Sequence, residues 1–273
     1  MARNIRLYPA LFVMVVTTTV MMAYWSHWKL SHKDMVRSVL ALCYMTNLSE
    51  LGGIFHNTWS LGVEEHFYVA WSLALPWVSE LSTRPRALLL GGLTLVSALV
   101  NMRVFPGPYW LVGDTSLSAN LFKLLIGACL RLLPLPRFLY SKFTAHVGFA
   151  CLALLILSPF VDATRALVAP VAPILAVSSA ALIIMASVVG DEAGSVPFLQ
   201  SKAFRFTGRI SYGWYLWQLP MQKLTSWSER RRQRPVFLAV SATSVGFLAA
   251  VASTFLLEEP IRAWFKDRQR RKR

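Results

Sequence analysis

The sequence contains few charged residues and very few acidic ones. Only 15% of its 273 residues are Asp, Glu, Lys or Arg, whereas soluble globular domains contain about 25%. The acids number 13 against 28 Lys and Arg, which leaves a formal net charge of +15. Long stretches without any charge recur along the whole chain, and 55% of the residues are hydrophobic. The composition therefore predicts an integral membrane protein and argues against a soluble one.

Cysteine is also scarce, and no soluble domain, internal repeat or low-complexity linker interrupts the chain. The three cysteines, Cys43, Cys129 and Cys151, lie in or near apolar runs without metal-ligand or paired spacing, so we interpret them as small core residues. No metal site is predicted. A basic soluble protein would suggest a nucleic-acid partner, but membrane proteins collect Lys and Arg in their cytoplasmic loops. We therefore expect membrane lipids as partners and no nucleic acid.

The apolar runs predict about eight transmembrane helices, because about 18 or more apolar residues suffice to cross a bilayer and a backbone in lipid must satisfy its own polar groups. The fold class is all-α, a polytopic transmembrane helical bundle formed by a single domain over residues 1–273, with a basic cytoplasmic tail at 262–273. The run at 39–47 is too short to span and is interpreted as re-entrant or interfacial. The expected spans are 9–24, 61–78, 87–104, 118–133, 144–161, 166–190, 210–227 and 235–257.

The distribution of Lys and Arg predicts the orientation of these spans. With the N-terminus inside, the inner segments hold nearly twice as many Lys and Arg as the outer ones, so both termini are expected in the cytoplasm. The basic run at 229–234 argues against this assignment, because it would lie outside. If residues 39–47 crossed the bilayer, the inside and outside assignments of the first segments would be exchanged relative to those of the later segments.

The stretch "NTWSLGVEEHFY" at 57–68 places acidic residues at the start of an apolar run. Ser60 is predicted to cap the helix that follows it, with Glu64 in the first turn, where the helix dipole favours a carboxylate. Helical spacing puts Ser60, Glu64, Tyr68 and Trp71 roughly on one face. Two interpretations remain open at this point: an interfacial cap with belt aromatics, or a functional polar site at the membrane edge.

This stretch resembles the signature of the acyltransferase-3 family of bacterial integral membrane O-acyltransferases, which reads close to H-x-W-S-L-x-V-E-E-Q-F-Y. Asn57 stands where a His is common, with His56 beside it, and His66 stands where Gln is usual. The matching residues are Trp59, Ser60, Leu61, Val63, Glu64, Glu65, Phe67 and Tyr68.

Three further segments resemble the same family, in the same order along the chain. "MARNIRLYPAL" is similar to an R-x-x-R-I-x-P element, with Arg3, Arg6 and Pro9 in register. "TGRISYGWYLWQLPM" is similar to G-R-I-S-Y-x-L-Y-L-W-H-x-P, with Gln218 in place of the usual His. "FLLEEPIRAW" is similar to the terminal I-E-x-P-x-R element. Its matching residues are Glu258, Pro260 and Arg262.

The resemblance implies a fold, an activity and a location. Family members usually have about ten spans, each of normal crossing length, and the first carries a histidine expected to act as the catalytic base. This chain is therefore expected to be N-terminally truncated, so that a missing segment or a partner chain would supply those spans. The implied reaction moves an acyl group, normally acetyl, from cytoplasmic acyl-CoA to a hydroxyl of an extracytoplasmic sugar or glycan. The implied location is the bacterial cytoplasmic (inner) membrane, with no tightly bound cofactor.

The resemblance also implies roles for individual residues. Arg3 and Arg6 would contact the phosphates of acyl-CoA, although positive-inside anchoring explains them as well. Glu64 is the expected catalytic residue on the acceptor side, and Glu258 with Arg262 is expected to form a structural ion pair. Aromatic and hydroxyl side chains would line the acyl or sugar path, unless they serve interface packing alone. These substrate-binding candidates are Trp59, Ser60, Tyr68, Tyr212, Tyr215 and Trp217.

Two alternatives to an active enzyme remain. The chain could be a non-catalytic remnant or subunit that keeps the fold without the base. It could also be a transporter or flippase, although such proteins often contain two related halves with broken helices, and no such repeat is visible in this sequence.

Overall fold

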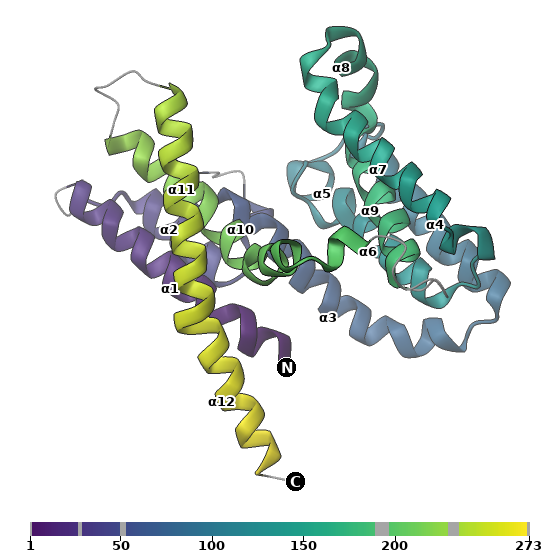
Figure 1. Cartoon of the computed structure of the whole chain (residues 1–273), viewed down its shortest axis with the longest axis horizontal. Helices are drawn as coiled ribbons and strands as arrows, with labels where there is room; N and C mark the ends of the chain where they lie inside the picture. Colours follow the sequence, from purple (N-terminus) through teal and green to yellow (C-terminus); the bar gives the residue numbers. More distant parts are fainter. Residues whose placement is uncertain (1, 27–28, 50–52, 189–196, 229–234, 272–273) are drawn as a thin grey trace. The chain divides into compact units, whose positions relative to one another are not determined.

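In the described residues, the computed structural model of the chain consists of helices joined by turns and loops, without strands, which confirms the predicted all-α fold (Figure 1). It describes residues 2–26, 29–49, 53–188, 197–228 and 235–271, without the side chains of 2–6, 137, 163, 188, 197–198, 226–228, 235–239, 241–242, 266 and 269. The helices and short 3₁₀ or π turns (η) are α1 (Ala2–Trp25), α2 (His32–Leu42), η1 (Thr46–Leu48), η2 (His56–Thr58), α3 (Trp59–Glu80), α4 (Thr83–Asn101), α5 (Tyr109–Val112), α6 (Leu117–Leu132), η3 (Arg137–Tyr140), α7 (Lys142–Leu157), η4 (Ser158–Phe160), α8 (Asp162–Val168), η5 (Ala169–Val171), α9 (Ala172–Val188), η6 (Pro197–Gln200), α10 (Lys202–Ser228), α11 (Pro235–Ser253), η7 (Thr254–Glu258) and α12 (Glu259–Arg270).

The chain divides into two compact units. The first unit combines both ends of the chain, Met1–Gly62 and Lys202–Arg273, and the second unit is the intervening Val63–Ser201. The family-like segments that surround Arg3, Trp59, Tyr212 and Glu258 all contribute to the first unit. Sequence separation therefore says little about which of these segments meet in space.

The first unit has its apolar core between α1 and α10, which contact one another. Both helices bury apolar side chains at three- and four-residue spacing, so each has one apolar face. These residues are Leu11, Met14, Val15 and Met22 of α1, and Leu216, Trp217, Met221 and Leu224 of α10.

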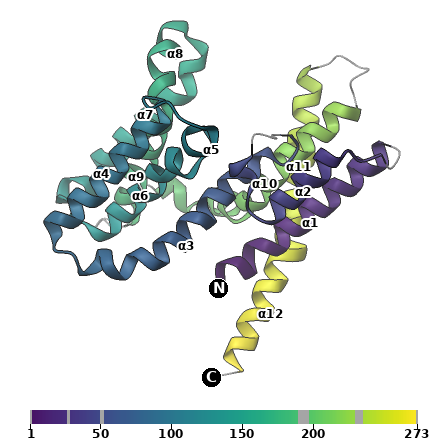
Figure 2. The same ribbon diagram turned by 180° about the vertical axis from the view of Figure 1, so that it is seen from behind.

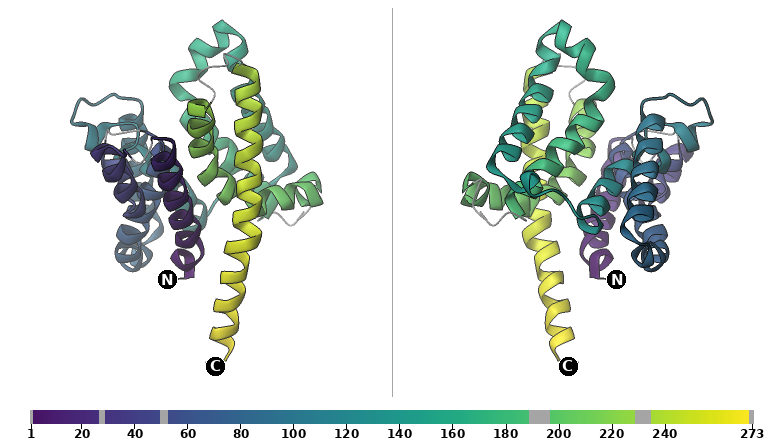
Figure 3. Two further views of the ribbon diagram at one scale, coloured as in Figure 1. Left: turned by 90° about the vertical axis from the view of Figure 1, so that its left-hand side faces the viewer. Right: turned by 90° about the vertical axis from the view of Figure 1, so that its right-hand side faces the viewer.

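At the end of the chain, α11, the π turn η7 and α12 follow one another as a single long rod (Figure 3). The predicted basic tail at 262–273 is thus helical as far as Arg270. Pro260 is the second residue after the π turn, which is consistent with a proline that cannot continue a regular hydrogen-bond ladder.

The second unit is built from helix pairs, with α4 against α6 and α7 against α9 (Figure 2). A Cβ added to Gly148 of α7 would lie 2.8 Å from Cγ1 of Ile183 and 3.0 Å from the carbonyl oxygen of Ser179, both on α9. The close approach of these two helices therefore depends on a residue without a side chain.

Arg86 of α4 closes the ends of two other helices in the second unit. Its guanidinium donates to the carbonyl oxygens of Leu81 (2.5 Å), Ser79 (2.6 Å), Val78 (3.2 Å) and Leu132 (3.2 Å). The last carbonyls of a helix have no partner within that helix, so this one side chain satisfies the C-terminal ends of α3 and α6 together.

Within the described part of the chain, five segments are long and apolar enough to cross a membrane. They are Leu7–Trp25, Tyr109–Leu132, Lys142–Phe160, Thr164–Ser187 and Thr243–Phe265. Many large apolar side chains on these and neighbouring helices are exposed, among them Leu73, Leu167 and Leu256. Exposed apolar surface on this scale is typical of a protein that contacts lipid, and the protein is a membrane helical bundle.

The individual spans differ in part from those predicted. The segments 61–78, 87–104 and 210–227 form α3, α4 and α10 but are not among the five, so the count of eight stays a prediction. The span predicted at 166–190 is interrupted by the 3₁₀ turn η5, because Pro170 and Pro173 have no N–H for a regular helix.

Candidate functional site

The best-defined polar site lies in the first unit, where the segment before α3 meets the middle of α10. The side-chain amide of Asn57 donates to the carbonyl oxygens of Tyr215 (2.7 Å) and Leu216 (3.3 Å). We call this contact, together with Ser60 and Pro220, the α3–α10 junction. It joins two segments of the family-like signature that lie 158 residues apart in sequence.

The position of Pro220 explains why α10 needs an external donor here. A proline removes the N–H that would bond to the carbonyl four residues earlier, and for Pro220 that carbonyl belongs to Leu216. Asn57 donates to this carbonyl and to the one before it. The amide thus compensates for the proline, and a buried carbonyl that would be costly to leave unpaired gains a partner.

The hydroxyl of Tyr215 completes the junction. It donates to the carbonyl oxygen of Asn57 and lies 2.6 Å from Oγ of Ser60. Because a phenol has a single proton, the Ser60 hydroxyl must be the donor in the second bond. Two of the predicted substrate-binding residues, Ser60 and Tyr215, are therefore in direct contact.

The predicted capping role of Ser60 is wrong. A 3₁₀ turn at His56–Thr58 leads directly into α3, which begins at Trp59. Ser60 therefore lies inside the first turn, where its hydroxyl contacts Tyr215. Glu64 consequently lies beyond the first turn of α3, which contains no acidic residue, so the argument from the helix dipole does not apply to it.

Buried polar residues also pack around the start of α3, next to the junction. Oγ1 of Thr46 and Oγ1 of Thr58 are 2.9 Å apart, and both residues are buried. A Cβ on Gly62 would lie 2.4 Å from Oδ1 of Asn47 and 2.5 Å from the carbonyl oxygen of Tyr44. The start of α3 can therefore dock against η1 only because residue 62 is glycine.

Three buried polar atoms beside the junction have no hydrogen-bond partner among the described residues: Nδ1 of His56, Oδ1 of Asn57 and Nε1 of Trp217. Buried polar atoms in folded proteins are nearly always paired, and exceptions often mark catalytic or ligand-binding places. An imidazole nitrogen, an amide oxygen and an indole N–H together offer both donor and acceptor capacity to a hydroxyl-bearing ligand. His56 was not assigned a role from sequence, although it adjoins the signature.

The other predicted site residues have different surroundings. Tyr212 donates from its hydroxyl to the carbonyl oxygen of Leu7 at 2.9 Å, which ties α10 to α1. The backbones of Arg3 and Arg6 belong to α1, but their side chains lie outside the described residues, so their contact with acyl-CoA stays a prediction. Trp59 is half-buried at the first position of α3.

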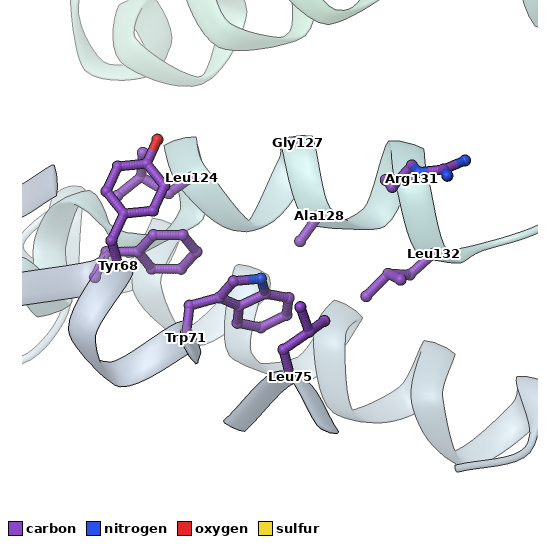
Figure 4. Close-up of a pocket in the computed structure, with 9 residues that line it drawn as sticks. Tyr68, Trp71, Leu75, Leu124, Gly127, Ala128, Arg131 and Leu132 are labelled. Carbon is purple, nitrogen blue, oxygen red and sulfur yellow. The ribbon is translucent and has the colours of Figure 1, made fainter. Parts of the chain in front are cut away.

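Tyr68 belongs to the second unit, where it lines a pocket with Phe67 and Trp71 of α3 (Figure 4). The rings of Phe67 and Trp71 stack with their centroids 5.5 Å apart. Glu64 is half-buried, and its catalytic role stays a prediction. The structure thus brings Ser60 and Tyr215 together, whereas Tyr68 belongs to a separate set of contacts.

An ion pair that the sequence analysis missed joins the terminal signature element to the segment around Tyr212. Arg209 binds Glu259 through two hydrogen bonds, from Nη2 to Oε2 at 2.5 Å and from Nε to Oε1. The hydrogen bond to this carboxylate raises the pKa of Arg209, and its guanidinium lies 4.7 Å from the ring centroid of Phe255. Glu258 is buried and lies one turn before Arg262, and an ion pair between these two stays a prediction.

No group of three or more His, Cys, Asp or Glu side chains that could hold a metal ion occurs in the parts of the chain that the structure describes. The polar chemistry of the junction instead comes from hydroxyl, amide, imidazole and indole groups.

Comparison with known proteins adds independent information. The model of a family described as an acyltransferase domain matches residues 1–259. The chain is 28% identical over 287 residues to YrhL of Bacillus subtilis (strain 168), a candidate peptidoglycan O-acetyltransferase. It is 27% identical over 293 residues to OatA of Listeria monocytogenes serovar 1/2a (strain ATCC BAA-679 / EGD-e), a peptidoglycan O-acetyltransferase. Each alignment covers 94% of this chain but only 44% and 45% of the relatives. No solved structure matches.

Proposed function

This chain belongs to the family of membrane acyltransferases whose model matches residues 1–259, and we propose that it transfers an acetyl group from cytoplasmic acetyl-CoA to a sugar hydroxyl of peptidoglycan. The donor and the direction of transfer follow from the family resemblance, and the acceptor follows from the names of YrhL and OatA. The proposal includes an enzyme in the bacterial cytoplasmic membrane with both termini in the cytoplasm.

The α3–α10 junction is the observation that carries this proposal. Ordered polar groups within an apolar membrane bundle are costly, and they are functional candidates by default. Here they come from two separate signature segments and leave His56, Asn57 and Trp217 with unused hydrogen-bonding atoms. Buried polar atoms without a partner are rare in folded proteins, and each one here could bind a polar group of a ligand.

The reaction requires a base at the acceptor hydroxyl. The hydroxyl oxygen attacks the thioester carbonyl, an ester bond forms, the carbon–sulfur bond breaks and CoA leaves as the thiol after it gains the proton. Two side chains near the start of α3 have groups that can accept that proton, His56 at the junction and Glu64 in the helix. Tyr215 and Ser60 would hold the acceptor sugar, and Arg3 with Arg6 would bind the phosphates of CoA.

Acetylation in cells tests this function directly. The chain is expressed in a bacterial host whose peptidoglycan is not O-acetylated, and acetate released from purified peptidoglycan by mild alkali is quantified. We expect ester-linked acetate with the wild-type chain and a loss of roughly tenfold to a hundredfold with Tyr215→Phe, because displaced substrate groups react far more slowly.

The matched control is Tyr24→Phe, which alters an exposed tyrosine of α1 and should leave the yield unchanged. If a folded, membrane-inserted wild-type chain yields no ester-linked acetate, transfer by this chain alone is contradicted. That result would favour the alternative of a non-catalytic remnant or subunit.

A further inference from the structure

The pocket beside Tyr68 is a groove between α3 and α6 within the second unit, with a volume of about 460 Å³. Aromatic and aliphatic side chains of α3, including Trp71 and Leu75, form one wall. The facing stretch of α6 contributes Gly127 and Ala128, whose small size leaves the space open (Figure 4). A Cβ added to Gly127 would meet no atom within 4 Å.

The size and lining of this groove fit one hydrocarbon chain. Its volume of about 460 Å³ lies within the range of small-ligand pockets. Most of the lining side chains are apolar, so a chain in the groove would lose no hydrogen bond. A bulky polar substrate would instead leave its own groups unpaired against these apolar side chains.

The groove has a cation at one end. Arg131 lies in the last turn of α6, one residue before the end of a candidate membrane span at Leu132, and Figure 4 places it at the opposite end of the groove from Tyr68. Its side chain is exposed, and no carboxylate among the described residues forms an ion pair with it. An arginine at the edge of a span lies at the depth of lipid phosphates.

We propose that this groove binds one acyl chain of an anionic phospholipid, whose phosphate pairs with Arg131. The chain lies against Trp71 and Leu75, and the second acyl chain stays in the bilayer. Basic pockets between transmembrane helices hold anionic headgroups in this way. The site is independent of the acetyl-transfer proposal, because none of its residues belongs to the α3–α10 junction.

Trp71 makes this site measurable by fluorescence. The purified full chain is reconstituted into phosphatidylcholine vesicles that contain a minor fraction of brominated phosphatidylglycerol or, separately, brominated phosphatidylcholine. The difference in quenching between the wild type and Trp71→Phe isolates the signal from the groove. We expect about fivefold preferential quenching by the anionic lipid, which is the effect of roughly one arginine at a membrane surface.

Two variants with matched controls decide the outcome. Gly127→Leu fills the groove and should abolish quenching by both lipids, whereas Gly92→Leu on α4, which also adds a side chain in open space, should change nothing. Arg131→Gln should remove only the anionic preference, and Arg165→Gln, an exposed arginine outside the groove, should keep it. Equal quenching by the two lipids in the wild type, or quenching that Gly127→Leu leaves intact, would overturn the proposal.

Discussion

The two units use polar side chains in different ways. In the first unit, side-chain hydrogen bonds join segments that lie 155 to 205 residues apart, as between Ser60 and Tyr215 or between Tyr212 and Leu7. In the second unit, the interhelical polar contacts span shorter separations, such as 21 residues between Ser97 and Ser118 and 46 residues between Arg86 and Leu132. The longest-range polar contacts therefore occur in the first unit, and the second unit consists of helix pairs that are closer in sequence.

This difference suggests that the two units have different functions. Long-range polar contacts in an apolar environment fix a few side chains in register, which is what a catalytic site requires. Local helix pairing makes a stable wall that leaves apolar surface to the lipid. The signature segments that converge in the first unit and the apolar groove of the second unit agree with this division. Changes to the first unit should therefore affect both stability and acetylation. Apart from Glu64, which is a candidate base, changes to the second unit (Val63–Ser201) should affect mainly stability.

The largest effect is expected at Gly62, where the first unit is packed most tightly. In Gly62→Val, the new side chain would collide with the backbone of Tyr44 and with Asn47. We expect destabilisation of about 3 kcal/mol, measured by thermal unfolding in detergent, together with loss of acetylation. Gly208→Ala in α10, whose Cβ meets open space, is the control. Equal unfolding temperatures for the two variants would contradict the prediction that close packing of α3 at Gly62 stabilises the junction.

A smaller effect is expected where Asn57 compensates for Pro220. Asn57→Ala leaves two carbonyl oxygens of α10 without a side-chain donor, and we expect a loss of about 1–2 kcal/mol in the free energy of unfolding. Pro220→Ala restores the backbone N–H that can bond to Leu216. In that background Asn57→Ala should cost about 1 kcal/mol less, as a double-mutant cycle would measure. If the losses in the free energy of unfolding from the two substitutions simply add, the Asn57 amide does not compensate for Pro220.

Sequence reasoning predicted the helices well and the site only in part. Apolar runs are local signals of helices. Ser116 and Ser141 cap α6 and α7 with their hydroxyls, but the sequence analysis predicted a cap only at Ser60, which was wrong. The resemblance pointed to Ser60 and Tyr215, but their contact depends on how distant segments dock. Helical spacing suggested Glu258 with Arg262, whereas the pair of Arg209 with Glu259 spans 50 residues and has no local signal.

A substitution of Arg86 tests whether contacts in the second unit affect stability alone. Arg86→Gln removes donors from four carbonyl oxygens at the ends of α3 and α6. Because water can replace part of these bonds at a helix end, we expect a loss of about 1 kcal/mol in the free energy of unfolding. Acetylation should fall only as far as the amount of folded protein in the membrane falls. A loss of activity per folded molecule would show that the second unit also positions the site.

The smallest effect is expected at the ion pair between Arg209 and Glu259, although it joins two signature segments. The arginine side chain is 51% exposed, and exposed ion pairs contribute little because water and salt screen them. Arg209→Gln should therefore shift the unfolding temperature less than any change above, and high salt should remove the shift. The hydrogen bond that raises the pKa of Arg209 leaves this side chain charged across the neutral range, so the contribution should not vary with pH near neutrality. A large loss of acetylation with unchanged stability would instead assign Arg209 to substrate binding, and the matched variant Glu259→Gln would then show whether the carboxylate positions it.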